Sequence, residues 1–445
     1  MQDMRKEFQN RKTVIFGAGR RGMSCLSLLR RIDVRPYCFF DNRAEEGDER
    51  DGIPVFRPLS DKDAVVIITV KDRYDEIASQ LLGIGYSPEA IYTMEHLMGY
   101  LQEKERPVSR YPATIQLPIT HLCNFDCVMC GMHHMIGRPD FTAEELGRIL
   151  KDDLFGEVTS VGVNGGEPFL KKDLADCIRA IITNCPKTRD LFFISNGYFT
   201  ERIRTSLREI RNVCADRNVC IHLSLSLDGV EDMQDFHRGC KNSYRNLVET
   251  LHMLRTEGDL TDDLDIICTV TRYNIFRIRE VEAFSRREGI PVAYNIATEN
   301  VRIENEDRLQ DFSLFSDETA RHLAMEFFYA KYMETRSEKY FGLFLYLRDK
   351  RRYAECPCRQ NEWVTLTPDC ELGYCATHSK KLGNALERSA REIYDEHLSY
   401  LDEIKETYCE GCSHYGYHLG GEGYAELYHH NLLIDHRLWR EGQEC

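Results

Sequence analysis

The sequence predicts an α/β protein in which two successive runs of alternating strands and helices precede a cysteine-rich C-terminal part. Three observations support this class. Short apolar runs recur between amphipathic segments, glycine turns follow several of these runs, and a charged stretch with two prolines at 101–112 separates the two series. We expect domains at residues 1–105, 112–310 and 311–445, which suits a chain of 445 residues at about 150 residues per domain.

The composition is that of an ordinary globular protein, with 42% hydrophobic and 29% charged residues. The net charge of −15 argues against a nucleic-acid partner, because a phosphate backbone is bound by clustered lysine and arginine. No apolar stretch is long enough to span a bilayer, so we expect no membrane partner. The 18 cysteines stand out. No export signal is visible near the start, so we expect a cytoplasmic protein whose clustered cysteines hold metal.

The first run contains strands at 12–16, 35–41, 53–56, 64–69 and 90–93, with a helix near 74–82. Gly17, Gly19 and Gly22 follow its first strand and open a helix, and Asp41 ends the next strand. This pattern is typical of a dinucleotide-binding turn, in which phosphate meets a helix N-terminus and the acid binds a ribose. The unit resembles small Rossmann-like modules attached to bacterial glycan-biosynthesis enzymes. Two roles remain open for it: binding of a nucleotide or nucleotide-sugar, and docking without a ligand.

The second run predicts six strand–helix units. Its strands lie at 113–118, 158–163, 191–195, 220–227, 264–270 and 292–297, with helical patterns between them, for example at 141–154 and 243–256. Six such units predict a parallel (β/α)6 partial TIM barrel with function at the carboxyl ends of the strands. A long amphipathic helix is predicted at 316–337.

Three cysteines follow the first strand of this barrel. Cys123, Cys127 and Cys130 occupy eight residues of one loop, so three thiolates can reach three corners of one cluster. Zinc prefers four ligands, and the missing fourth ligand therefore favours a 4Fe-4S cluster with one open iron. A chance group of three buried cysteines at a strand end is the less favoured interpretation.

These residues and the motifs after the following strands resemble the radical S-adenosylmethionine (radical SAM) superfamily. Gly165-Gly166-Glu167 is similar to the family's GGE motif, which receives the methionyl amino group, and Asn196 lies in a turn like the family's T-N-G. Ser226 and Arg238 occupy its S-x-D-G and H-x-R-G patterns, which implies contacts to the cofactor's ribose and carboxylate. The resemblance implies a catalytic 4Fe-4S cluster and S-adenosyl-L-methionine as cofactors. Met129 stands where an aromatic residue is common.

The C-terminal cysteines resemble a SPASM or twitch domain. The resemblance implies one auxiliary 4Fe-4S cluster held by four of them. These are Cys358, Cys375, Cys409 and Cys412. Cys356 is a rival for the first position, and zinc on the same four ligands is a further alternative. A two-cluster arrangement would use Cys370, His418 or Cys445. Cys370 stands where the family has the glycine of a turn.

The implied function is reductive cleavage of S-adenosylmethionine to a 5′-deoxyadenosyl radical that abstracts hydrogen from a polar substrate. We expect an oxidoreductase or related enzyme acting on a sugar or nucleotide-sugar in glycan or natural-product biosynthesis. A peptide maturase acting on a ribosomal precursor is the alternative, and a non-catalytic iron-sulfur redox sensor or scaffold is the alternative of another class. Flavodoxin or ferredoxin would supply the electron. No catalytic side chain is assigned from the sequence.

The remaining cysteines lie singly within predicted strands and helices, and we interpret them as small apolar fillers. They are Cys25, Cys38, Cys177, Cys185, Cys214, Cys220, Cys240 and Cys268. The pairs His133-His134 and His429-His430 are interpreted as solvated or partly buried residues, because adjacent side chains rarely share one target.

Overall fold

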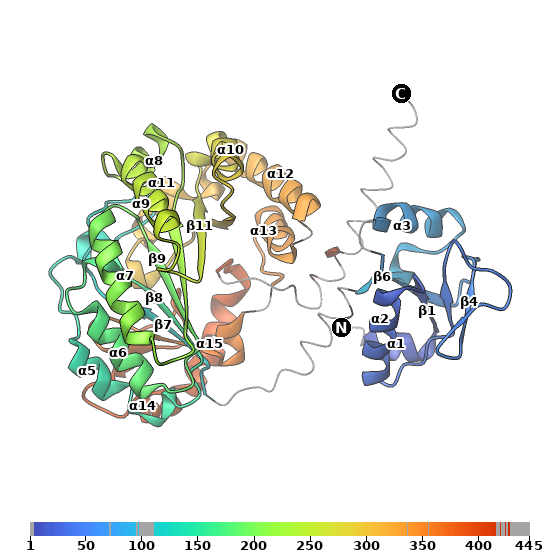
Figure 1. The fold of residues 1–445 in the computed structure, drawn as a ribbon, viewed down its shortest axis with the longest axis horizontal. Helices are drawn as coiled ribbons and strands as arrows, with labels where there is room; N and C mark the ends of the chain where they lie inside the picture. The colour runs from blue at the N-terminus through green and yellow to red at the C-terminus, as the bar shows by residue number, and fades with distance from the viewer. Residues whose placement is uncertain are drawn as a thin grey trace. The chain divides into compact units, whose positions relative to one another are not determined.

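The computed structural model describes residues 4–70, 73–94, 97, 111–335, 337–354 and 356–414, together with Leu419, Gly423, Glu426 and Leu427. These residues belong to two compact units, one within residues 1–107 and 418–445 and one within 108–417. Each unit has its own sheet and its own helices (Figure 1). Within the described part of the chain, no helix combines the length and the apolar character needed to cross a bilayer.

The N-terminal unit is a parallel sheet with one antiparallel edge, in the order β3-β4-β2-β1-β5-β6. Its strands are β1 (Lys12–Phe16), β2 (Cys38–Phe40), β3 (Glu49–Arg50), β4 (Ile53–Phe56), β5 (Ala64–Ile68) and β6 (Ile91–Thr93). Its helices include α1 (Met4–Asn10), α2 (Arg20–Arg31) and α3 (Tyr74–Gly83). Among the strands described in this unit, only β3 pairs antiparallel. The predicted Rossmann-like alternation is confirmed.

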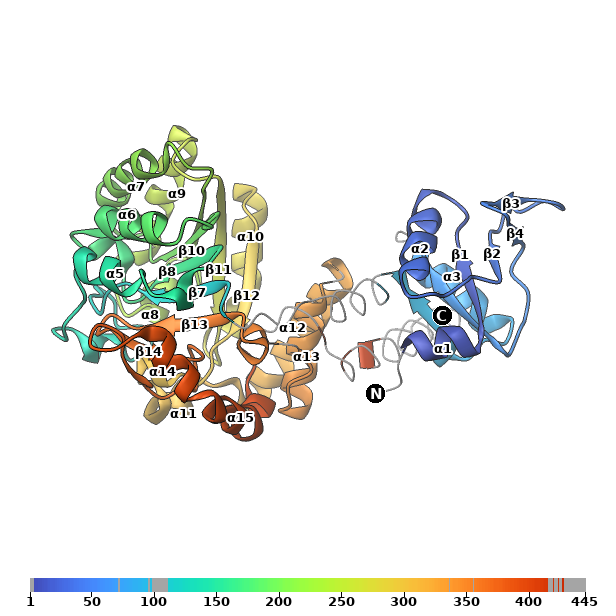
Figure 2. The same cartoon turned by 90° about the horizontal axis from the view of Figure 1, so that it is seen from below.

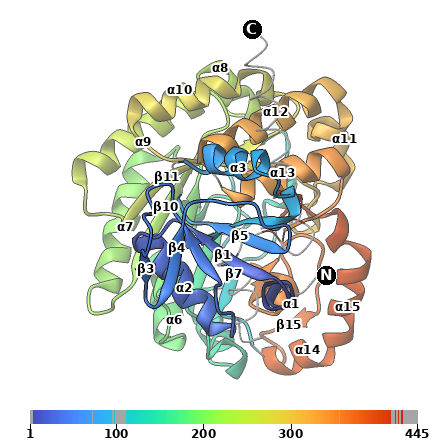
Figure 3. The same cartoon turned by 90° about the vertical axis from the view of Figure 1, so that its right-hand side faces the viewer.

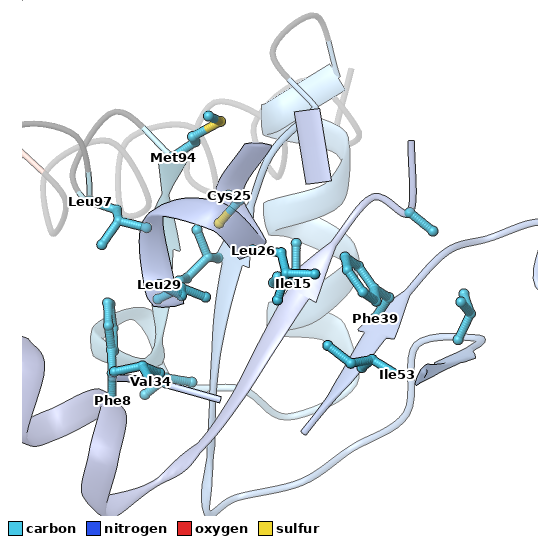
Figure 4. Close-up of a cluster of buried hydrophobic side chains, with 14 of the residues drawn as sticks. Phe8, Ile15, Cys25, Leu26, Leu29, Val34, Phe39, Ile53, Met94 and Leu97 are labelled. Carbon is cyan, nitrogen blue, oxygen red and sulfur yellow. The ribbon is translucent and has the colours of Figure 1, made fainter. Parts of the chain in front are cut away.

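Alternating side chains of β1 build two cores, one on each face of the sheet. Ile15 packs with Leu26 and Leu29 of α2 and with Phe39 (Figure 4). Val14, one residue earlier, lies in the cluster on the other face. Strands buried on both faces are expected to be continuously apolar, which explains why β1 and β5 were visible in the sequence.

The second unit is built on six parallel strands that pair in chain order, from β7 to β12. They are β7 (Thr114–Pro118), β8 (Ser160–Asn164), β9 (Asp190–Ser195), β10 (Cys220–Ser226), β11 (Asp263–Val270) and β12 (Val292–Ile296). The connecting helices are α5 (Ala143–Ile149), α6 (Leu174–Asn184), α7 (Thr200–Cys214), α8 (Asp232–His237), α9 (Ser243–Glu257) and α10 (Ile278–Glu288). Helices α6, α7, α9 and α10 follow one another around the strands (Figure 3). The predicted (β/α)6 partial barrel is confirmed.

The C-terminal part continues this sheet. Strand β13 (Trp363–Leu366) pairs parallel with β7, and β14 (Glu371–Gly373) and β15 (Gly383–Asn384) follow antiparallel. Figure 2 shows β13 and β14 beside β7, with α14 (Ala390–Glu396) and α15 (Leu398–Thr407) next to them. The expected boundary at 310/311 therefore lies inside one compact unit. The predicted long helix is α12 (Glu318–Thr335), and α13 (Glu338–Asp349) follows it.

The barrel strands present one face to the helices and the other to the concave interior. On β9, Leu191 and Phe193 are fully buried, whereas Phe192 remains 45% exposed. The concave face is thus open along part of its length. Cys220 lies on that face and is exposed, which corrects its interpretation as an apolar filler, whereas Cys177 and Cys268 are fully buried as expected. His133 and His134 are exposed, and His429-His430 lies outside the described residues.

Candidate cluster and cofactor site

The three-cysteine loop is fixed to the loop after β8 by backbone hydrogen bonds. The Gly166 N–H donates to the Thr120 carbonyl (2.9 Å), and the Glu167 N–H donates to the Leu122 carbonyl (2.7 Å). A Cβ on Gly166 would lie 2.1 Å from the Leu122 oxygen, so this close approach requires glycine. Gly166, which is predicted to contact the cofactor, therefore also holds the cysteine loop in place.

Cys123, Cys127 and Cys130 line one side of a cavity of about 340 Å³ at the carboxyl ends of the strands. The same cavity is lined by most of the residues implied by the superfamily resemblance. These are Gly165, Gly166, Asn196, Ser226 and Arg238. The structure thus brings together the cysteine loop and residues that follow β8, β9 and β10, as the motif order predicts.

The donor set fits an iron-sulfur cluster better than zinc. Among the described residues, no three cysteine sulfurs lie within 4.8 Å of one another. Tetrahedral zinc would bring its thiolates to about 3.8 Å. Burial raises the pKa of all three thiols, so their thiolate forms need a cationic partner. A 4Fe-4S cubane with three protein ligands is larger than a zinc ion, so it fits the wider spacing of the sulfurs, and its irons supply the cations that the thiolates need.

Glu167 is placed behind the cavity wall. Its carboxylate accepts hydrogen bonds from the Ser195 hydroxyl (2.9 Å), the Asn196 N–H (2.7 Å) and the Phe169 N–H (3.2 Å). Burial raises the pKa of Glu167 to about 7 against the effect of these donors. In this structure the carboxylate ties the β8 loop to the end of β9, and the residues that line the cavity are the adjacent glycines.

A buried ion network holds Arg238 beside the cysteines. Its Nε lies 2.8 Å from Asp228 Oδ2, and its Nη1 lies 4.0 Å from Cys127 Sγ. Asp228 also contacts His237 Nδ1 (2.9 Å) and accepts from the Thr269 N–H (2.7 Å). Burial acts to raise the pKa of Asp228, but Arg238 and His237 outweigh it and hold the pKa below its ordinary value. Asp228 therefore stays anionic and orients a cation toward the cysteine loop.

Sequence reasoning missed the segment after β12 that covers the cysteine loop. Asn305 Nδ2 donates to the Met129 carbonyl (2.8 Å), and Arg308 Nη1 donates to the Cys130 carbonyl (3.0 Å). A Cβ on Gly131 would lie 2.3 Å from the backbone oxygens of residues 303 and 304. Nothing in the local sequence pattern marks this contact, because the partners are more than 170 residues apart.

Lys339 is a second feature that the sequence did not reveal. It belongs to α13 and lines the cavity together with Leu343 and with Thr269 and Asn295 of the barrel strands. Burial lowers the pKa of Lys339 to about 8, and Asp265 partly opposes this shift. No aspartate or glutamate lines this cavity among the described residues, whereas Lys339 joins two arginines there. The cavity is therefore cationic in a chain with a net charge of −15.

The C-terminal cysteines gather into a second group. Cys356, Cys358, Cys375, Cys409 and Cys412 influence one another's ionisation. Interaction with the Cys358 thiol lowers the pKa of Cys356, and the same interaction raises the pKa of Cys358. Both candidates for the first ligand therefore lie in the group, and the structure leaves that choice open. His418 and Cys445, invoked for a second auxiliary cluster, lie outside the described residues.

Arg352 organises this second group. Its Nη1 donates to the Cys412 carbonyl (2.9 Å), its Nη2 donates to the His414 carbonyl (2.8 Å), and its Nε donates to the Ala354 carbonyl (2.6 Å). Burial acts to lower the pKa of Arg352, and the neighbouring thiols, Cys356 first, raise it overall. One guanidinium thus joins the two halves of the cysteine group and offers positive charge to it.

Cys370 occupies the turn between β13 and β14 rather than the cysteine group. Its φ of +67° is the left-handed conformation that favours glycine, and its N–H donates to the Thr367 carbonyl (3.0 Å). The left-handed backbone at this position explains why the family that the domain resembles has a glycine in this turn.

The N-terminal glycine turn is compact. Gly17 has a φ of +106°, and a Cβ on Gly22 would lie 1.9 Å from the Gly17 oxygen. Asp41 Oδ2 accepts from the Ala18 N–H (3.3 Å), and its Oδ1 accepts from the Arg43 N–H (3.0 Å). Gly19 precedes α2 without a side-chain cap. The four predicted residues therefore lie together at the ends of β1 and β2.

Comparison with known proteins adds a decisive observation for the second unit. Residues 117–275 match the Radical SAM superfamily. They form a radical SAM domain. This family uses a 4Fe-4S cluster and S-adenosylmethionine, and the matched residues include all three cysteines of the loop and the cavity-lining positions after β8, β9 and β10.

Curated relatives match shorter parts of the chain. A PqqA peptide cyclase of Bradyrhizobium diazoefficiens is 27% identical over 188 residues, which are 40% of this chain and 45% of that protein. A probable GTP 3′,8-cyclase of Metallosphaera sedula is 32% identical over 107 residues, or 21% of this chain and 30% of that protein. The chain thus spans less than half the length of these relatives. The solved structure of anSMEcpe with bound AdoMet covers 73% of this chain and 96% of its own, at 15% identity and a TM-score of 0.48.

Proposed function

We propose that this protein is a radical SAM enzyme that abstracts a hydrogen atom from a peptide substrate. The observation that carries the proposal is the single cavity that joins three cysteines, a glycine pair, Ser226 and Arg238 at the carboxyl ends of the barrel strands. Parallel α/β folds place their reactive groups at this end. When bound, the cluster and S-adenosylmethionine supply a 5′-deoxyadenosyl radical by one-electron reduction.

The chain's own residues bind and orient these groups. Cys123, Cys127 and Cys130 would hold three irons and leave the fourth open for the cofactor. Gly165 and Gly166 expose backbone for a close approach by the methionyl group. Arg238, kept charged by Asp228, would offset the negative charge of the cluster and of the cofactor carboxylate.

The second cysteine group would hold one auxiliary 4Fe-4S cluster. Cys375, Cys409 and Cys412 supply three ligands, and Cys358 or Cys356 supplies the fourth. The wide spacing of the sulfurs supports a cubane over zinc, since no three of them lie within 4.8 Å in the described part of the chain. Full ligation by four cysteines favours electron transfer as its role, with flavodoxin or ferredoxin as the external donor.

A peptide is the better-supported substrate class. Of the two curated relatives described above, one is named for a peptide and the other for the nucleotide GTP, and neither is named for a sugar or nucleotide-sugar. The alignment with a PqqA peptide cyclase extends over 40% of the chain, about twice the share aligned with the GTP 3′,8-cyclase. The N-terminal module would then bind a nucleotide or dock a partner, and Gly17, Gly19, Gly22 and Asp41 are the residues to test by equilibrium dialysis.

The first experiment measures 5′-deoxyadenosine released by the anaerobically reconstituted, reduced protein. Release is expected from the wild type and from Cys185→Ala, a buried cysteine that does not line the cavity. Cys127→Ala is expected to abolish it. Retained cleavage in Cys127→Ala would rule out the assignment of the loop.

The second experiment separates the substrate classes. Deuterated candidate precursor peptides and deuterated nucleotide-sugars are supplied in parallel, and deuterium in 5′-deoxyadenosine is measured by mass spectrometry. Transfer from a peptide is expected. If deuterium were transferred only from a nucleotide-sugar, the substrate would be a nucleotide-sugar and not a peptide.

A further inference from the structure

Three metal-binding side chains of different chemistry meet on the concave face of the barrel sheet, away from both cysteine groups. Ligand atoms of Asp190, Cys220 and His222 all lie within 4.8 Å of one another. They come from the first residues of β9 and β10, at the ends of the strands opposite the radical SAM cysteines. Strand register explains the meeting, because Cys220 pairs directly with Asp190 and His222 follows on the same face.

The imidazole of His222 is held in one orientation. Its Nδ1 lies 2.7 Å from Asp263 Oδ2, and its Nε2 lies 2.9 Å from Asp190 Oδ1. Phe192 stacks on the ring at 4.3 Å between centroids and 12° between planes. A carboxylate on one ring nitrogen is the usual support of a histidine that binds metal through the other.

We propose that Asp190, Cys220 and His222 bind one Zn²⁺ ion, with Asp263 orienting the histidine from behind and solvent completing the coordination. Imidazole, thiolate and carboxylate are all zinc ligands, and three of them with one open position is a common zinc arrangement. The bound ion would bridge the N-terminal ends of β9 and β10, where the concave face is otherwise open.

The geometry needs only a small adjustment. Tetrahedral zinc places a nitrogen and an oxygen ligand about 3.3 Å apart and a sulfur about 3.5 Å from either. The Nε2–Oδ1 distance of 2.9 Å must therefore widen slightly. Cys220 is exposed, so rotation of its side chain can bring the sulfur closer without disturbing a core.

Ion pairing alone explains less of this arrangement. Two carboxylates around a histidine account for the two short contacts, but they leave the cysteine without a role. An exposed cysteine on the open face of a strand is unusual, since free cysteine is among the most buried residue types. Zinc gives all three side chains one function.

The test uses the anaerobically reconstituted protein, titrated with zinc sulfate, desalted and analysed for zinc and iron by mass spectrometry. Wild type is expected to retain one zinc with its iron unchanged. Cys220→Ser and His222→Gln are expected to lose that zinc. Asp263→Asn is expected to keep the site with an affinity roughly 10–100-fold weaker.

The matched control is His252→Gln, which removes an exposed histidine that pairs with Glu288 but belongs to no group of three metal-binding side chains among the described residues. It should retain zinc like the wild type. Equal zinc in Cys220→Ser and wild type, uptake matched by loss of iron, or no uptake by the wild type would each overturn the proposal. Cleavage of S-adenosylmethionine is measured on the same samples, and its presence or absence is independent of this result.

Discussion

Arg238 Nε lies 2.8 Å from Asp228 Oδ2, and both side chains are buried, so the charge of each depends on the other. The same guanidinium reaches Cys127 Sγ at 4.0 Å. The ion pair therefore links fold stability to the cluster site, because a change at Asp228 alters the cation beside the cysteines.

Asp228→Asn should destabilise the fold and weaken cofactor binding. It leaves a buried arginine without its carboxylate, and removal of one partner of such a pair costs about 3–5 kcal/mol. Denaturant unfolding under anaerobic conditions measures the loss. Asp232→Asn is the matched control, because Asp232 pairs with Arg277 at the surface, and there we expect about 0–1 kcal/mol. Equal losses in the two variants would contradict the role of burial.

Gly166→Ala should disrupt the catalytic cluster. The added methyl would meet the Leu122 carbonyl at 2.1 Å, and this carbonyl belongs to the loop that carries Cys123. We expect loss of most of the iron of this cluster and of 5′-deoxyadenosine release. Gly147→Ala, in helix α5, is the control, since the nearest atom to its added methyl would be the Ala180 Cβ of α6, 3.6 Å away. Normal iron content in Gly166→Ala would show that the loop tolerates displacement.

Cys370→Gly should stabilise the protein without changing its iron content. Glycine adopts the left-handed conformation at little cost, whereas another residue there carries strain of about 1 kcal/mol. A higher unfolding midpoint with unchanged iron is the expected result. Lower iron would instead support the two-cluster arrangement, in which Cys370 is a ligand.

The parts of the fold that depend on local pattern could be predicted from sequence. Strands β7 to β12 are apolar runs between amphipathic helices. The spacing of Cys123, Cys127 and Cys130 predicts a cluster-binding loop after the first of these strands. The pairing of β13 with β7 could not be predicted, because a four-residue strand does not specify a partner some 250 residues earlier. The contact of Asn305 with the Met129 carbonyl was hidden for the same reason. The interpretation of Cys220 as an apolar filler was wrong. The alternation of apolar and polar residues along a strand shows which face a residue occupies, but it does not show that the concave face is open to solvent.

Lys339 should give the unfolding stability a distinct pH dependence. The pKa of Lys339 is lowered to about 8 by burial, from an ordinary value of 10.5, so the unfolded chain binds more protons between these values. This contribution to stability should therefore rise as pH increases from about 8 to about 10.5. Lys339→Met should abolish this rise in stability with pH. Lys172→Met, which replaces an exposed lysine, should leave the rise unchanged. Parallel stability curves for wild type and Lys339→Met would contradict the burial of a charged group.

The choice between Cys356 and Cys358 as the fourth auxiliary ligand is open to a direct comparison. Cys358 lies near Cys356, Cys375 and Cys412, and Cys356 also influences Cys409. Alanine at the true ligand should remove the auxiliary cluster and reduce the iron from about eight to about four per chain, because each cubane contains four irons. Alanine at the other cysteine should leave the iron count unchanged. Cys370→Gly serves as the control.

Two further outcomes have distinct meanings. If both alanine variants retain about eight irons, each cysteine can replace the other, since both thiols lie in the group and interact with each other. If the wild type contains about four irons and a zinc that persists in Cys220→Ser, the C-terminal group is a zinc site. The Cys220→Ser background is essential here, because it removes the zinc expected at the concave face and leaves the metal of the C-terminal cysteines to be counted alone.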